Sequence, residues 1–324
     1  MIKTPEFWLK KNIKSLLLTP ISYIYWIFFT FDKLFSKNYS SKKFIICIGN
    51  INLGGSGKTP SAIAFGKLLE ELDINYVFLS RGYRGTNKKL LLLDSNGSYS
   101  SAITGDEPLL LKEQAPTYIC KNRLKAIRQL SDNSNFDAII LDDGYQNHSV
   151  KKDVNVLIID AKFGFGNKLL FPAGPLRQSV KSGLKQADLI IVIGKMGLKL
   201  KKIIPDEKII NASIKIKNVK KFQGKQYIAF CGIAYPQKFF SLLKENNINL
   251  YQQIEFSDHY KYCTQDLDKI IHLSQKHNMP VITTKKDWVK FDDKYKKQID
   301  FLDIDIIFSD KNKVKQFIKS KISD

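Results

Sequence analysis

The feature that most constrains the fold is a glycine-rich segment between a short apolar run and an amphipathic helix. Phe44–Ile48 is apolar without alternation, which is typical of a buried parallel strand. It leads into GNINLGGSGKTP (residues 49–60), and the expected helix continues to about Leu72. This order predicts a phosphate-binding loop, because loop N–H groups and a helix N-terminus both attract phosphate.

Six residues of this loop are candidate nucleotide ligands: Gly54, Gly55, Ser56, Gly57, Lys58 and Thr59. Lys58 is expected to reach the β- and γ-phosphates of ATP, and Thr59 to hold Mg²⁺. The strict G-x4-GK[ST] pattern needs glycine at position 52, where this chain has Asn52. The intact 54–59 core and its strand–helix context still favour nucleotide binding over a glycine-rich turn that binds nothing.

A second acidic motif completes the expected nucleotide site. Four apolar residues, 138–141, precede Asp142 and Asp143, which is a Walker B pattern. With Thr59, these carboxylates are expected to hold Mg²⁺ directly or through water. Cytosolic ATP is the natural ligand of such a site, so the core is expected inside the cell.

Apolar runs separated by helical stretches predict a doubly wound, mainly parallel α/β sheet of the P-loop NTPase type. The predicted strands are Phe44–Ile48, Tyr76–Leu79, Leu90–Leu93, Tyr118–Cys120, Val154–Asp160 and Leu189–Ile193. Ligands of such sheets bind beyond the carboxyl ends of the strands, where the motifs above lie.

The pattern changes after Gly194. Residues 195–225 are strongly basic, which is typical of a lobe boundary or a solvated face, with a membrane-facing patch as the alternative. Beyond them, a smaller α/β lobe is expected, with predicted strands Gln226–Cys231, Val281–Thr283 and Ile304–Phe308 and a C-terminal helix. The predicted division is therefore an N-terminal segment (1–40), a P-loop kinase core (41–205) and a smaller lobe (206–324).

The N-terminal segment predicts contact with a membrane. Residues 15–31 carry no charge, are mostly apolar and have lysines on both sides. A spanning helix needs about 20 apolar residues, and Pro20 interrupts this run of 17. An interfacial or hairpin-like anchor is favoured, since Tyr23, Tyr25 and Trp26 suit the headgroup level. A single span and a helix packed on the protein itself remain alternatives.

Net charge indicates the class of partner, and cysteine content indicates the cellular compartment. The 52 basic and 31 acidic residues give a net charge of +21, which favours an anionic partner such as nucleic acid, acidic lipid or a phosphorylated substrate. Only five of the basic residues are arginine, so gene base composition is an alternative source of the lysine excess. The four cysteines form no CxxC pair, which argues against a structural zinc site and fits a reducing compartment.

Further motifs share an order that carries a resemblance. They are SRGYRG (80–85), GDEP (105–108), DDGYQN (142–147), GFGN (164–167), PAGPLR (172–177), FSDH (256–259) and TKKDWVK (284–290). With the loop GN-x-x-x-GG-x-GKTP, this series resembles the tetraacyldisaccharide 4′-kinase family, the lipid A 4′-kinases of Gram-negative bacteria. Asn52 fits that family's loop. Tyr260 and Lys285 depart from it, since many members have His and Glu there.

The resemblance implies an activity and a site. The family transfers the γ-phosphate of ATP, with Mg²⁺, to the 4′-hydroxyl of tetraacyldisaccharide 1-phosphate, forming lipid IVA at the cytosolic face of the inner membrane. It implies that Asp106 is the general base and that His259 orients or tunes it. From the residues alone, Asp106 and Glu107 could equally be a helix cap and a first-turn charge. The candidate substrate-side residues are Arg81, Tyr83, Arg84 and Gln146.

The expected partners are ATP, an acylated disaccharide lipid and the membrane surface, with no nucleic acid and no obligate protein partner. The main alternative is a membrane-associated P-loop NTPase that acts as a switch or targeting factor. A basic nucleic-acid-binding protein is a third reading, which predicts salt-sensitive affinity for DNA or RNA. It is disfavoured because no nucleic-acid motif supports it.

Overall fold

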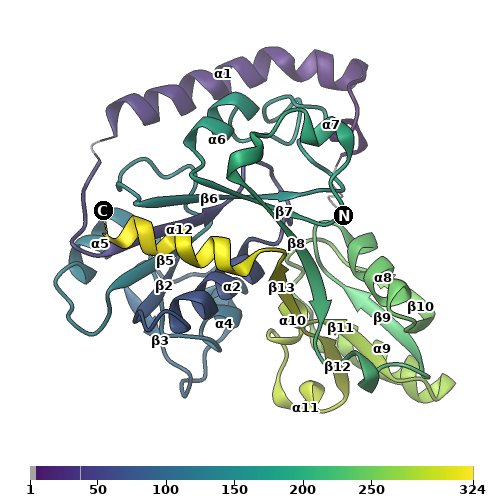
Figure 1. The fold of residues 1–324 in the computed structure, drawn as a ribbon. Coiled ribbons are helices and arrows are strands. Elements are labelled where there is room, and N and C mark those ends of the chain that lie inside the picture. Colours follow the sequence, from purple (N-terminus) through teal and green to yellow (C-terminus); the bar gives the residue numbers. More distant parts are fainter. Residues whose placement is uncertain (1–4, 37, 324) are drawn as a thin grey trace.

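The computed structural model describes residues 5–36 and 38–323, which form two sheets and their covering helices (Figure 1). The larger sheet has nine strands in the order β13-β8-β7-β6-β1-β5-β2-β4-β3, and the smaller has four in the order β10-β9-β11-β12. The predicted mainly parallel α/β fold is confirmed, since only the two edge strands β3 and β13 pair antiparallel.

The strands are β1 (Phe44–Gly49), β2 (Tyr76–Ser80), β3 (Leu91–Leu93), β4 (Thr117–Ile119), β5 (Ala138–Asp142), β6 (Val154–Asp160), β7 (Leu189–Ile193), β8 (Ile209–Ile216), β9 (Gln226–Cys231), β10 (Asn249–Glu255), β11 (Val281–Thr284), β12 (Ile299–Leu302) and β13 (Ile304–Phe308). The α-helices are α1 (Ile13–Phe35), α2 (Lys58–Glu70), α3 (Ser101–Thr104), α4 (Glu107–Leu111), α5 (Arg123–Leu130), α6 (Val180–Gln186), α7 (Leu198–Lys201), α8 (Pro236–Glu245), α9 (Thr264–His277), α10 (Lys285–Trp288), α11 (Asp293–Lys296) and α12 (Lys311–Ser323). Three short 3-10 helices complete the order, Glu6–Trp8, Asp206–Lys208 and Val219–Lys221.

The centre of the large sheet is β1, which pairs in parallel with β5 and β6. Its residues 45–49 are buried, because helices cover both faces of the sheet. Side chains of α5, α6 and α7 pack on one face, and side chains of α2, α4 and α12 pack on the other. The P-loop and the Walker B pair therefore follow two neighbouring central strands and lie at the same edge of the sheet.

The smaller sheet belongs to a unit inserted between β8 and β13 of the larger sheet. It has two cores of its own: α8 packs on one face, together with Ile216 at the end of β8, and α9 with the residues around α11 packs on the other. The strand Ile304–Phe308, predicted for the smaller lobe, instead pairs with β8 in the large sheet. The segment 195–225, predicted as a boundary or solvated face, contains β8, which lies parallel to β7.

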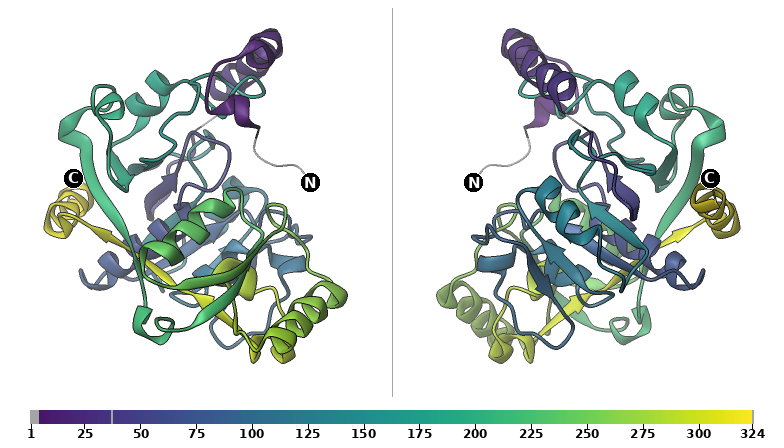
Figure 2. Two further views of the ribbon diagram at one scale, coloured as in Figure 1. Left: turned by 90° about the vertical axis from the view of Figure 1, so that its right-hand side faces the viewer. Right: turned by 90° about the vertical axis from the view of Figure 1, so that its left-hand side faces the viewer.

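Helix α1 lies along the outside of the large-sheet unit, near α6 and α7 (Figures 1 and 2). Asn12 caps its N-terminus, since the Asn12 side chain accepts a hydrogen bond from the N–H of Ser15. Ser22 is the helix's main buried anchor: its hydroxyl donates to Leu170 O (2.9 Å) and accepts from the N–H of Ala173 (3.1 Å). The Tyr25 hydroxyl donates to Arg177 O at 3.0 Å. The helix is thus held against the loop that carries PAGPLR.

Candidate functional site

The predicted phosphate loop adopts a conformation that needs its glycines. Gly54 and Gly57 have φ angles of +105° and +85°, which L side chains rarely adopt. Gly57 ends the loop, and Lys58 and Thr59 are the first residues of α2. Asn52, which breaks the strict loop pattern, donates a hydrogen bond from its side chain to Gly164 O at 2.8 Å. Position 52 therefore ties the loop to the GFGN motif.

The Walker B carboxylates have different surroundings. Asp142 ends β5 and is buried; its Oδ2 accepts a hydrogen bond from the Thr59 hydroxyl at 3.0 Å, while its buried Oδ1 has no hydrogen-bond partner. Burial, with the charges of Glu107 and Asp143, raises the pKa of Asp142 to about 7. Asp143 lies 3.5 Å from Lys58 Nζ and 3.0 Å from Arg177 Nη1. Burial alone would raise the pKa of Asp143, but these cations hold it far below its usual range.

Two arginines fix this turn. The buried Arg123 guanidinium donates to the carbonyl oxygens of Asp142 (3.0 Å) and Asp143 (2.8 Å). Arg177 donates to the Asp143 carboxylate and to Gln146 Oε1. Gln146, predicted on the substrate side, donates to Asn50 O at 2.8 Å and so joins the Walker B turn to the start of the phosphate loop.

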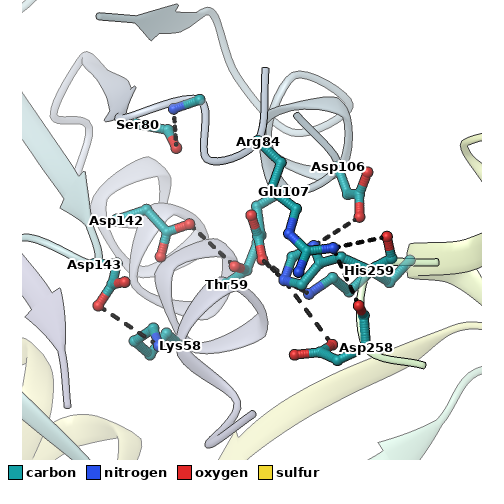
Figure 3. Close-up of polar contacts among 12 residues, drawn as sticks. Lys58, Thr59, Ser80, Arg84, Asp106, Glu107, Asp142, Asp143, Asp258 and His259 are labelled. Carbon is teal, nitrogen blue, oxygen red and sulfur yellow. Dashed lines mark hydrogen bonds and ion pairs between the residues drawn. The ribbon is translucent and has the colours of Figure 1, made fainter. Parts of the chain in front are cut away.

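A second polar group lies beside the first (Figure 3). Asp106 precedes α4, and its Oδ2 lies 2.9 Å from His259 Nδ1, although the two residues are 153 positions apart. Burial raises the pKa of Asp106, but the His259 hydrogen bond and the charges of Lys290 and Lys286 outweigh it, so this pKa is lowered. Glu107 begins α4, and its negative charge contributes to the raised pKa of Asp142. The charges of this second group therefore act on the Walker B carboxylate of the first group.

Two of the predicted substrate-side residues of SRGYRG lie next to this pair. Tyr83 and Arg84 are exposed, and the Tyr83 ring meets the His259 ring edge-on with centroids 5.3 Å apart. Arg84 Nη1 donates to the carbonyl oxygens of Asp258 (3.2 Å) and His259 (3.1 Å). Arg81 is also exposed at the end of β2. Tyr83 and Arg84 therefore border the Asp106–His259 pair, and Gln146 borders the Walker B turn. The charge of Arg81 acts on Arg123, which also holds that turn.

The inserted unit also contacts the phosphate loop directly. Lys238 of α8 donates to Gly55 O at 2.6 Å and lies 2.5 Å from Asp160 Oδ2 at the end of β6. The rings of Phe163 and Tyr235 stack beside this contact, with centroids 4.2 Å apart. A small cavity next to the loop is lined by these residues and by residues 51–56.

Sequence reasoning missed several residues of the site. Lys286 and Lys290 contact His259 and Asp106 respectively, and Lys238 and Arg123 support the nucleotide motifs. Lys286 and Lys290 belong to the TKKDWVK motif, so its position in the ordered series was the available signal. His148, which directly follows the DDGYQN motif, packs edge-on against Phe29 of α1. Its pKa is lowered to about 4, by burial first and then by Lys152 and Lys33.

The donor set fits a magnesium ion that is also bound by phosphates. In the part of the chain that the structure describes, no cluster of three or more His, Cys, Asp or Glu side chains could hold a metal. The unpartnered Asp142 Oδ1 and the Thr59 hydroxyl are oxygen donors, as Mg²⁺ prefers, and Mg²⁺ commonly takes its remaining ligands from phosphates and water. Asp143, by contrast, already pairs with Lys58 and Arg177.

The fold and the site together define a P-loop phosphotransferase whose second polar group comes partly from an inserted α/β unit. The family model for tetraacyldisaccharide-1-P 4′-kinase matches residues 14–323. A tetraacyldisaccharide 4′-kinase of Rickettsia felis is 36% identical over 291 residues, 89% of this chain and 88% of that protein. One of Gluconobacter oxydans is 32% identical over 313 residues, 95% and 94% of the two chains.

Solved structures agree. The crystal structure of LpxK from Aquifex aeolicus in complex with ATP superposes with a TM-score of 0.77 at 25% identity, covering 95% of this chain and 99% of that one. The chain belongs to the tetraacyldisaccharide 4′-kinase family, and the resemblance carried by the motifs is confirmed.

Proposed function

We propose that this enzyme transfers the γ-phosphate of ATP to the 4′-hydroxyl of tetraacyldisaccharide 1-phosphate, the acceptor named in its family. One observation supports this most directly: the Asp106–His259 pair lies beside the nucleotide motifs (Figure 3), and Glu107, the residue after Asp106, helps to raise the pKa of the Walker B residue Asp142. A kinase needs both a nucleotide site and a proton acceptor for the attacking hydroxyl. A switch NTPase has no need of the second group, so the pair disfavours that alternative.

Each side chain has a distinct task in this proposal. The loop N–H groups and Lys58 bind the phosphates, and Asp106 accepts the proton of the 4′-hydroxyl while His259 orients its carboxylate. Thr59 and Asp142 would hold Mg²⁺, which would supply positive charge to offset the charge that develops on the transferred phosphoryl group. Asp143 keeps Lys58 and Arg177 in place around that centre. Arg81, Tyr83 and Arg84 face the acceptor.

Helix α1 supports access to a lipid acceptor from the membrane surface. It is the one helix, among residues 5–36 and 38–323, long and apolar enough to cross a membrane, yet only 11% of its most apolar window is buried. Its exposed apolar side chains include Leu16, Leu17, Ile24 and Phe28. Because Ser22 and Tyr25 hold its opposite side on the protein, we propose that α1 lies in the interface of the cytosolic leaflet.

The proposal is tested with purified protein, ATP, Mg²⁺ and tetraacyldisaccharide 1-phosphate in mixed micelles. The expected result is an acceptor carrying one additional phosphate, formed with stoichiometric release of ADP. ADP release without a phosphorylated lipid would instead support the switch NTPase and overturn the kinase assignment.

The base assignment has its own test. Asp106→Ala removes the proton acceptor but leaves the phosphate loop, so phosphotransfer is expected to fall about 100-fold or more while ATP affinity stays within about 3-fold. Lys294→Ala, which changes a lysine of α11 in the inserted unit, serves as the control. Near wild-type transfer by the Asp106 variant would show that another group accepts the proton.

A further inference from the structure

Lys286 contacts the edge of the His259 ring that is turned away from Asp106. It lies in α10, and its Nζ is 3.1 Å from His259 Nε2 and 2.9 Å from Glu107 Oε1. The other ring nitrogen, Nδ1, is 2.9 Å from Asp106 Oδ2. Each nitrogen of the His259 ring thus has one close polar partner, and the two partners come from different sheet units.

The chemistry of these partners decides the tautomer of the ring. An ammonium group has three N–H donors and no acceptor, so a hydrogen bond from Lys286 requires a lone pair on His259 Nε2. A neutral imidazole then carries its proton on Nδ1, from which it donates to the Asp106 carboxylate. A doubly protonated ring would direct an N–H at the ammonium across 3.1 Å.

We infer that Lys286 is a positioning residue that holds His259 neutral and Nδ1-protonated, and so directs its N–H to Asp106. The tautomer itself does not depend on the proposed function, but its role in catalysis does.

Contacts to Asp106 also distinguish its two carboxylate oxygens. Lys290 Nζ lies 3.3 Å from Oδ2, the atom that His259 also contacts. In residues 5–36 and 38–323 the side-chain contacts of Asp106 all involve Oδ2, which leaves Oδ1 to accept the hydroxyl proton.

Lys290 is itself fixed by a buried partner. Its Nζ lies 2.9 Å from Asp287 Oδ1, and the Asp287 side chain is fully buried. Asp287 Oδ2 accepts hydrogen bonds from the Gly232 N–H (2.9 Å) and the Thr284 hydroxyl (2.8 Å). The TKKDWVK motif therefore brings one lysine to each member of the Asp106–His259 pair: Lys286 lies on the short helix α10, Lys290 lies just after it, and Asp287 anchors the segment.

Other charges around His259 show why Lys286 matters. Glu107 Oε1 and Asp258 Oδ1 lie 3.7 and 3.9 Å from Nε2, and carboxylate oxygens are acceptors that suit an N–H on this nitrogen. Arg84 donates to the His259 carbonyl oxygen, and Tyr83 presents its ring edge-on to the imidazole. Removing the Lys286 ammonium would leave two carboxylates facing Nε2. The ring would then bind a proton at Nε2, as the charged form or as the other tautomer.

The direct test is the ¹⁵N spectrum of histidine-labelled, full-length protein without substrate. The His259 signals are assigned by comparison with His259→Gln. At pH 7 wild type is expected to show a protonated Nδ1 and an unprotonated Nε2, and Lys286→Met is expected to gain a proton on Nε2. The matched control is Lys285→Met, since Lys285 pairs instead with Glu113 (2.6 Å) and Asp303 (3.1 Å). An Nε2-protonated wild type, or an unchanged ring in Lys286→Met, overturns the inference.

Kinetics supply the second readout. Lys286→Met is expected to lower kcat about 10- to 100-fold, to leave KM for ATP within about 2-fold, and to add an acidic limb to the pH profile of kcat. Lys286→Arg, which keeps a donor, is expected to restore part of kcat and to remove that limb. A wild-type enzyme without phosphotransfer would contradict the proposed function alone, because the ¹⁵N spectrum still decides the tautomer. An unaltered pH profile in a folded Lys286→Met enzyme that retains transfer would overturn the positioning role.

Discussion

At the scale of single residues, some side chains that lie outside the sequence motifs hold the backbone or the charged groups of those motifs in place. Lys238 is one example, since its ammonium holds both Gly55 O in the phosphate loop and the Asp160 carboxylate. A carbonyl that is held outward leaves the loop N–H groups free to face the phosphates. The contact therefore joins the inserted unit to nucleotide binding.

Replacing Lys238 tests that role. Lys238→Met is expected to raise KM for ATP about 5- to 20-fold, the equivalent of a hydrogen bond worth about 1–2 kcal/mol, with kcat within about 3-fold of wild type. Lys244→Met, at an exposed position near the end of the same helix, is the control. An unchanged KM for ATP in the Lys238 variant would show that the loop holds its conformation without this contact.

Asp142 gives a pH-dependent prediction. Its pKa is about 7 in the folded protein and about 4 in an unfolded chain. Between pH 4 and 7 the folded state therefore binds more protons, so the Asp142 contribution to the free energy of unfolding falls as pH rises, and the penalty is complete above pH 7. In EDTA and without nucleotide, Asp142→Asn is expected to raise Tm by about 2–6 °C at pH 8.

That difference should shrink towards zero near pH 4–5, where the wild-type carboxyl is protonated in the folded state. Differential scanning fluorimetry across pH 4–8 measures it, with Asp137→Asn as a control at an exposed position just before β5. An equal Tm gain at pH 5 and pH 8 would mean that the variant stabilises by packing and not by removing a buried charge.

At the scale of secondary-structure elements, α1 has two faces with different tasks. One is held on the protein through Ser22 and Tyr25, and the other exposes large apolar side chains, among them Leu17 at 73% and Phe28 at 70% exposure. Transfer of such an apolar surface from water into the membrane interface is favourable, and the flanking lysines add attraction to acidic lipid.

The double variant Leu17→Glu/Phe28→Glu is expected to abolish co-sedimentation with vesicles containing anionic lipid and to lower activity on vesicle-borne acceptor at least 10-fold. Its Tm should stay within about 2 °C of wild type, because both side chains are exposed. The control Ile307→Glu changes an exposed apolar residue of β13, a strand of the sheet. Retained vesicle binding would place the membrane contact elsewhere on the protein.

The same scale shows what the sequence could predict. Strands with continuous apolar runs, such as β1, β2 and β7, were predicted almost to the residue, because burial on both faces leaves no polar positions. β8, β10 and β12 were missed. β12 (IDFL) has only four residues and forms one edge of the smaller sheet. β8 (IINASIKI) is half exposed and lies in a lysine-rich stretch, and β10 (NLYQQIE) is an edge strand with mostly exposed or half-buried residues. Local composition reflects solvent exposure, so edge strands resemble loops.

The residues of the candidate site also differ in how far the sequence could predict them. Lys58, Thr59 and Asp142 were predicted from local motifs, and the structure brings them together. The Asp106–His259 contact depended on the resemblance, since no spacing rule links residues 153 positions apart. The lysines that orient this pair were not assigned a role, because a lysine excess in the sequence hides the few lysines that lie in the site.

At the scale of the whole molecule, the chain leaves the large sheet after β8 and returns to it at β13. The two ends of the insertion are neighbours, because Ile216 and Ile304 are paired in the antiparallel ladder between these strands. Each sheet has its own hydrophobic clusters, so the large sheet keeps most of its core without the insertion. His259, Lys286 and Lys238 all belong to the insertion. The Asp106–His259 pair is therefore divided between two structural units.

This arrangement predicts that the unit can be removed while the nucleotide-binding core stays folded. Replacing residues 217–303 by Asn-Gly, a sequence that favours a two-residue hairpin turn, should join β8 directly to β13. The shortened protein is expected to unfold in one cooperative thermal transition, to bind ATP about 10-fold more weakly because Lys238 is absent, and to have no phosphotransfer. Full-length His259→Ala is the control, since it should lose transfer but retain ATP affinity. An unfolded or aggregated product would show that the large sheet needs the inserted unit to fold, and transfer activity in the shortened protein would contradict the placement of the catalytic pair.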